Sequence, residues 1–158
     1  MSRIFGLPAV ALLWLLHFLP LSILSPIGRG LGLLLFHTGR QRRKVATINL
    51  AWCFPELDET QRMHLVRAHF EALGRSLLER SIFWWGSRER LDHLIAITGE
   101  EKIHALRAAG RPIILLAPHF VGLDAGGVAI TTRFAIVSIY AAQTNPLFDR
   151  LLLRGRLR

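Results

Sequence analysis

The chain contains 158 residues, of which 51% are hydrophobic, and carries a formal net charge of +9. This length accommodates one domain, and the apolar content favours a membrane-associated protein. Because Cys53 is the single cysteine, the composition excludes an intrachain disulfide and a metal site built from paired thiolates. A cytoplasmic setting fits this cysteine usage best.

The positive charge is concentrated at the two ends of the chain. Residues 1–44 contain six basic and no acidic side chains, and residues 150–158 contain four basic and no acidic ones, whereas residues 45–149 are close to neutral. A nucleic-acid-binding protein typically spreads its basic residues along a groove-facing element, with aromatic residues between them. We therefore expect no nucleic-acid partner, and the two local clusters favour a membrane surface or an acidic protein partner.

The first predicted element is a membrane anchor over residues 1–39. The 25 residues between Arg3 and Arg29 are uncharged, and a membrane-spanning helix needs about 20 apolar residues. Three prolines in this stretch are compatible with a kink or a partly interfacial position. The basic run 40–44 follows it, and segments rich in Lys and Arg stay cytoplasmic. A cleaved signal peptide is the alternative, but the apolar core is long for one.

An amphipathic helix is predicted to start at Asp58. Asp58 is suited to the N-cap, and Gln61 completes a capping box three residues later. Apolar residues then recur at alternating spacings of three and four, which is the pattern of one buried helix face. These positions are Met63, Val66, Phe70, Leu73 and Leu77.

Three aromatic residues near this helix allow more than one interpretation. His69 lies next to Phe70 in the sequence and is predicted to be a partly buried structural histidine. Trp84 and Trp85 could lie at a membrane interface, where amphipathic rings are favoured. The core of the protein is an equally good place for both indoles.

Residues 94–140 alternate between strand-like and helix-like segments. We expect strands at 94–98, 112–117 and 135–140, with helices at 99–110, closed by Gly110, and at 122–132. Apolar strands joined by short helices predict a mostly parallel sheet with covering helices. The expected fold class is therefore α/β, with an anchoring helix and a helical segment before part of the sheet. A last helix is predicted to begin at Asn145 and Pro146.

The candidate site is the stretch "HFVGLD", in which His119 follows a predicted strand and Asp124 opens the next helix. In a continuous helix these side chains would be separated by about 140°, so a break is needed between them. Pro118 and Gly122 are residues suited to such a break. A carboxylate beside an imidazole fixes its tautomer and stabilises the imidazolium, as a general base requires. With no serine or cysteine in the stretch, the base would act directly on a substrate hydroxyl.

The same stretch resembles the His-x4-Asp/Glu box of the glycerolipid and lysophospholipid acyltransferase superfamily. Residues 49–79 are similar to the segment that precedes the box in the late lipid A acyltransferases, which transfer lauroyl or myristoyl chains. The tail "NPLFDRLLLRGRLR" resembles the segment after it, including a Gly-Arg pair at Gly155 and Arg156. The chain departs from that branch in ending the box with Asp124 instead of Glu, and in having Ala141 and Ala142 where Arg-Pro is common.

The resemblance implies an acyltransferase in the cell inner membrane, with its catalytic part, residues 40–158, facing the cytoplasm. The donor would be a thioester on acyl carrier protein, and the acceptor a hydroxyl of a lipid A precursor. His119 would be the general base and Asp124 its partner. We expect neither a cofactor nor a metal, since the other histidines lack ligand-like spacing. The candidate substrate-binding residues are Arg150, Arg154, Arg156 and Gly122.

Two alternatives stay open. The same chemistry could act on another glycolipid or on an aminolipid. The chain could also be an inactive, truncated membrane-bound remnant. The resemblance implies that the chain is the amino-terminal portion of an enzyme, and that the stretch beyond this portion carries a further functional acidic residue.

Overall fold

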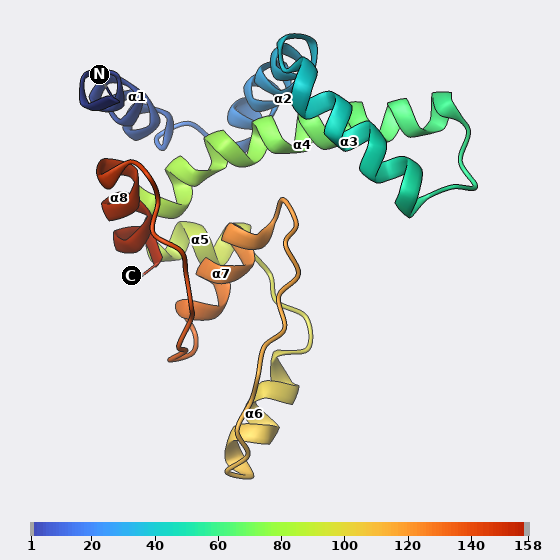
Figure 1. Ribbon diagram of the computed structural model, residues 1–158. Helices are drawn as coiled ribbons and strands as arrows, with labels where there is room; N and C mark the ends of the chain where they lie inside the picture. The colour runs from blue at the N-terminus through green and yellow to red at the C-terminus, as the bar shows by residue number, and fades with distance from the viewer. Residues whose placement is uncertain (1, 157–158) are drawn as a thin grey trace. The chain divides into compact units, whose positions relative to one another are not determined.

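The computed structural model describes residues 2–156 of the chain, with side chains placed over residues 7–155. Within these residues the regular structure is helical (Figure 1). The chain divides into two compact units, the first formed by Leu7–Ile82 and the second by Phe83–Arg158 together with Met1–Gly6. The helices are α1 (Ser2–Leu16), α2 (Leu21–Thr38), α3 (Arg40–Cys53), α4 (Glu59–Trp85), α5 (Arg88–Leu94), α6 (Glu100–Ala108), α7 (Leu123–Thr131) and α8 (Pro146–Arg156).

The predicted α/β fold with a mostly parallel sheet is wrong, because residues 2–156 contain no β-strand. The runs 112–117 and 135–140 follow irregular paths, and Figure 1 shows the first as part of a long thin trace between α6 and α7. Ile114 is 96% exposed and Val137 is fully exposed. A strand forms only where a neighbouring backbone takes up its hydrogen bonds. Neither run has such a neighbour in the described part of the chain, although both have strand-like composition.

The two helices predicted within residues 94–140 are confirmed. Helix α6 spans Glu100–Ala108, and Gly110 follows it with a φ of +66°, a value that glycine adopts without a steric penalty. Helix α7 spans Leu123–Thr131. Both helices form from local hydrogen bonds and therefore need no partner strand.

The amino-terminal apolar stretch forms two helices. The backbone N–H groups of Phe18 and Leu19 donate to the carbonyls of Leu15 and Leu16, at 3.3 and 3.1 Å. Pro20 then takes an extended conformation, with φ −65° and ψ 152°, and α2 starts directly after it. Among the described helices, α2 has the length and composition to cross a membrane, with a mean hydropathy of 1.2 over 18 residues. The basic run 40–44 forms the first turn of α3.

The predicted start of α4 is confirmed. The backbone N–H of Asp58 donates to Gln61 Oε1 at 3.0 Å, and the Gln61 N–H donates to Asp58 Oδ1 at 2.8 Å, which together make a capping box. Val66 and Phe70 are buried, as the spacing predicts. His69 is exposed, so its predicted partial burial is wrong. Its position one residue from the buried Phe70 turns it off the apolar face, by about 100°.

The first unit is held together by a close crossing of α2 and α4. A Cβ atom added to Gly74 would lie 2.3 Å from both the carbonyl oxygen of Gly28 and the backbone nitrogen of Gly32. Such distances show that the two backbones are in direct contact, which only glycine allows. The rings of Phe36 and Phe70 pack edge to face beside the crossing, with their centroids 5.8 Å apart.

The core of the second unit is formed by residues of α5, of α7 and of the segment directly after α7. Leu91, Val128 and Phe134 are buried. A Cβ atom added to Gly155 would lie 2.4 Å from Cδ1 of Trp84, so the Trp84 indole packs on the backbone of α8. This contact agrees with the core alternative for Trp84. Trp85 packs edge to face on Trp84, with the ring centroids 5.6 Å apart.

Candidate active site at the start of helix α7

The structure places His119 on irregular chain just before α7. Its side chain is exposed, and Pro118 precedes it. A turn follows, in which the backbone N–H of Leu123 donates to the carbonyl of Phe120 at 3.1 Å. An imidazole in this position is accessible to a substrate from solvent.

Asp124 lies in the first turn of α7 and is half-buried. A carboxylate is favoured there, because the free N–H groups at a helix start carry partial positive charge. Gly122 is the N-cap residue, with φ −81° and ψ 5°, a conformation open to any residue. The prediction that glycine at position 122 is needed for this turn is therefore wrong, because the turn does not use the conformational freedom of glycine. His119 and Asp124 lie on either side of this turn.

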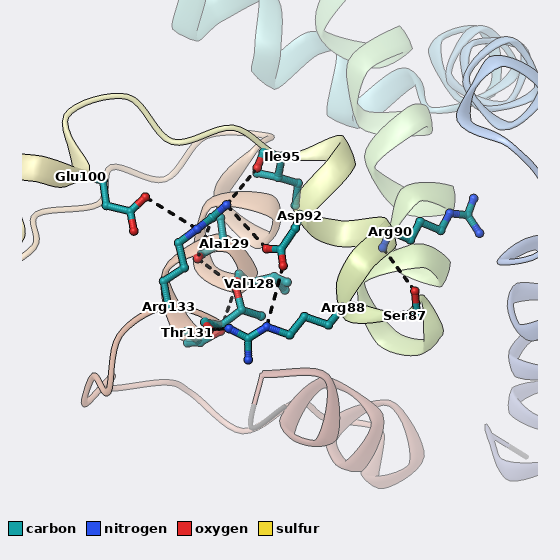
Figure 2. Close-up of polar contacts among 11 residues, drawn as sticks. Ser87, Arg88, Arg90, Asp92, Ile95, Glu100, Val128, Ala129, Thr131 and Arg133 are labelled. Carbon is teal, nitrogen blue, oxygen red and sulfur yellow. Dashed lines mark hydrogen bonds and ion pairs between the residues drawn. The ribbon is translucent and has the colours of Figure 1, made fainter.

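The carboxyl end of α7 is fixed by an arginine that sequence reasoning missed. Arg133 forms ion pairs with Asp92 at 3.6 Å and with Glu100 at 3.7 Å. It also donates to the carbonyls of Ile95 and Ala129, at 3.5 and 3.3 Å. Figure 2 shows its guanidinium between these groups. Arg133 is 22% exposed, Glu100 30% and Asp92 44%, so water screens the ion pair with Glu100 less than the one with Asp92.

Arg133 thereby links α7 to α5 and to the start of α6. A sequence signal for it exists, since a basic residue just after a helix complements the partial negative charge there. Arg88 adds a second link, because it donates to the Thr132 carbonyl. It also pairs with Asp92 at 3.8 Å (Figure 2). The helix that carries Asp124 is consequently anchored at the end opposite the candidate site.

Helix α8 carries the candidate substrate-binding arginines and packs against α7. Its predicted start is confirmed, because Asn145 Oδ1 accepts from the Leu147 N–H at 2.9 Å. Arg150 and Arg154 are exposed and, being four residues apart, share one face of the helix. The side chain of Arg156 lies outside the described residues. Two cations on one helix face can bind phosphate or carboxylate groups.

The two side chains have a chemistry suited to proton transfer. An exposed imidazole can accept a proton from a hydroxyl, and a carboxylate brought against it would orient it and stabilise its charged form. Among the described residues, no group of three or more His, Cys, Asp and Glu side chains is arranged to hold a metal ion.

Comparison with known proteins identifies the class. The model of the bacterial lipid A biosynthesis acyltransferase family matches residues 4–158. The chain therefore belongs to this family. No solved structure matches the chain.

Individual relatives carry related names. The chain is 33% identical over 149 residues to the lipid A biosynthesis lauroyltransferase of Escherichia coli K12, an alignment that covers 94% of the chain and 49% of that protein. It is 32% identical over 143 residues to a lipid A biosynthesis acyltransferase of Haemophilus influenzae, covering 89% and 45%. The palmitoleoyltransferase of Escherichia coli is 26% identical over 154 residues, covering 98% and 49%. The chain thus spans about half the length of the curated relatives it matches.

Proposed function

We propose that this protein transfers a fatty acyl chain to a hydroxyl of a lipid A precursor, with His119 as the general base. The observation that carries the proposal is the exposed imidazole immediately before α7, whose first turn contributes Asp124. Family membership supports the reaction class. The names of the relatives support lipid A as the acceptor class.

The reaction follows from the chemistry of these two side chains. The neutral imidazole of His119 removes the proton of the acceptor hydroxyl as its oxygen attacks the thioester carbonyl of acyl carrier protein. The new C–O bond forms, the C–S bond breaks, and the imidazolium returns its proton to the departing thiolate. Asp124 orients the ring and stabilises its charged form. A base of this kind contributes about 10² to 10⁴ in rate.

The remaining parts of the proposal concern binding and location. Arg150, Arg154 and Arg156 would bind lipid phosphates or the acidic carrier protein. Residues 1–39 would attach the protein to the inner membrane, and residues 40–158 would face the cytoplasm. The apolar helix α2 supports membrane association.

The direct test is an acyl-transfer assay with membranes that contain this protein. Labelled acyl carrier protein thioester is incubated with a lipid A precursor, and in parallel with another glycolipid and with an aminolipid. We expect the precursor to gain the mass of one fatty acid less water. Transfer to the other glycolipid or to the aminolipid alone would show that the acceptor is not a lipid A precursor. Transfer to none of them would contradict the proposal.

A further inference from the structure

One side of α2 carries exposed apolar side chains. Leu24, Gly28 and Gly32 lie on another side of the helix and are buried, the two glycines against α4. The exposed side chains are Ile23 (47%), Ile27 (48%) and Leu34 (58%). Spacings of four and seven residues place these three on one side of the helix.

An ion pair marks the midpoint of α2. Arg29 lies at the centre of Leu21–Thr38 and contacts Glu71 of α4 at 3.1 Å. Glu71 also pairs with Arg67 at 3.2 Å. If α2 crossed a bilayer with α4 attached, these three charged side chains would lie near the bilayer centre. Charged groups are strongly disfavoured there.

The contact with α4 cannot slide along α2 to remove this conflict. Cβ atoms added at Gly28, Gly32 and Gly74 would lie within 2.6 Å of backbone atoms on the other helix. Only this register brings the glycines opposite one another. Helix α2 is therefore long and apolar, but the charged side chains of the contact with α4 are held beside its midpoint.

A cluster of cations follows α2 directly. Arg40, Arg42 and Lys44 in the first turn of α3 are exposed. Arg43 donates to the carbonyl of Phe36 at 2.7 Å and lies over its ring at 5.0 Å, which fixes the start of α3 to the end of α2. Arg40 and Lys44 are four residues apart and share one face of α3. Exposed cations that follow an apolar helix complement the phosphates of an anionic lipid surface.

We propose that α2 lies in the plane of an anionic phospholipid bilayer surface instead of crossing it. Ile23, Ile27 and Leu34 enter the acyl-chain boundary, and the cations at the start of α3 contact lipid phosphates. Helices bound in this way bury their apolar face to a depth of about 5–10 Å. Arg29 and α4 then remain on the aqueous side. The inference rests on the proposed membrane association and is independent of acyl transfer.

The decisive experiment measures on which side of the membrane the two ends of α2 lie. Two variants of the full chain carry Cys53→Ser with either Ser22→Cys or Thr38→Cys, both at exposed positions. Sealed vesicles from producing cells, prepared in both orientations, are treated with a membrane-impermeant maleimide. We expect both thiols to react in the same preparation. Reaction in opposite preparations would show a spanning helix and overturn the proposal.

A binding measurement tests the apolar face itself. The purified chain is mixed with vesicles of phosphatidylcholine and phosphatidylglycerol. Ile27→Asp should lower the partition constant by about tenfold or more, because an isoleucine that enters the acyl-chain boundary of the bilayer is exchanged for a charge. Ala68→Asp places the same charge at an exposed position of α4 and should leave binding within about twofold. Equal losses for the two variants would overturn the proposal.

The outcomes separate this inference from the catalytic one. The His119→Ala protein should give the same labelling pattern and the same vesicle binding as the wild type, because neither depends on the base. If the wild-type chain binds no vesicles, both the in-plane position and the membrane association fail. Acyl transfer to an acceptor dispersed in detergent would still be measurable in that case.

Discussion

Apolar side chains are buried in one region of the molecule and exposed in another. The first region is the crossing of α2 and α4, and the second consists of the runs 112–117 and 135–140. In the crossing, backbones contact each other at three glycines, and Val66 and Phe70 beside them are buried. In the two runs, large apolar side chains such as Ile114 and Val137 are almost wholly exposed. Both regions have the composition of a protein core, yet of the two the crossing is the one that forms a packed interface among the described residues.

The difference shows what each kind of element needs. A helix satisfies its own backbone hydrogen bonds, so one neighbouring helix is enough to bury its apolar face. An exposed extended segment leaves its backbone groups to water until another strand pairs with it. We therefore expect substitutions to be costly at the crossing and nearly neutral in the two runs.

The largest effect of a glycine substitution is expected from Gly74→Ala. The added methyl group meets backbone atoms 2.3 Å away, and backbone cannot yield as a flexible side chain would. Overpacking typically costs about 1–3 kcal/mol and occasionally more, and we expect about 3 kcal/mol in the free energy of unfolding. Urea titration followed by circular dichroism measures it.

Gly30→Ala is the matched control for this variant. Gly30 lies in α2, and nothing lies within 4 Å of a Cβ added there. Alanine in place of glycine within a helix should stabilise it by up to about 1 kcal/mol. A similar loss for Gly30→Ala and Gly74→Ala would contradict the close crossing.

A smaller effect is expected from Gly155→Ala. The new methyl group meets the Trp84 ring at 2.4 Å, and a side chain can move aside at a cost of about 1–2 kcal/mol. The tryptophan emission should shift as Trp84 becomes more exposed. Gly127→Ala, where nothing lies within 4 Å of the added atom, serves as the control. An unchanged emission spectrum and stability for Gly155→Ala would refute the contact.

Arg133→Met tests how α7 is anchored. Loss of the guanidinium leaves Asp92 and Glu100 without this partner, and we expect a cost of about 1–2 kcal/mol. Hydrogen exchange should accelerate in α7 more than in α4. Arg154→Met removes an exposed arginine and should change neither quantity. Equal exchange rates in wild type and Arg133→Met would show that Arg133 does not anchor α7.

The smallest effect is expected from Val137→Lys. The side chain is fully exposed, and exposed substitutions usually change stability by no more than about 0.5 kcal/mol. The same change at the buried Val66 should unfold the first unit. A large loss of stability from Val137→Lys would mean that this run is buried, and would remove the comparison between the two regions.

Local signals in the sequence predicted several elements correctly. The capping pair Asp58 and Gln61, the helix-closing Gly110 and the start of α8 at Asn145 all depend on hydrogen bonds or dihedral angles within a few residues. His69 was misplaced because only one position separates it from the buried Phe70. Sequence proximity does not fix which side of a helix a residue takes.

Non-local features were predicted poorly. Strand-like composition at 112–117 predicted a sheet, but pairing depends on a partner segment that composition does not reveal. Arg133 was missed because its partners Asp92 and Glu100 lie 41 and 33 positions earlier in the sequence. For the site, the sequence predicted which residues flank the turn before α7. Their catalytic roles stay a prediction.

The most direct test of the account is the initial rate of acyl transfer to a lipid A precursor by wild-type and His119→Ala protein in matched membranes. We predict at least a roughly 100-fold lower rate for the variant, a small residual rate for Asp124→Asn, and a normal rate for His93→Ala, which alters an exposed histidine of α5. A normal rate for His119→Ala would contradict the proposed base.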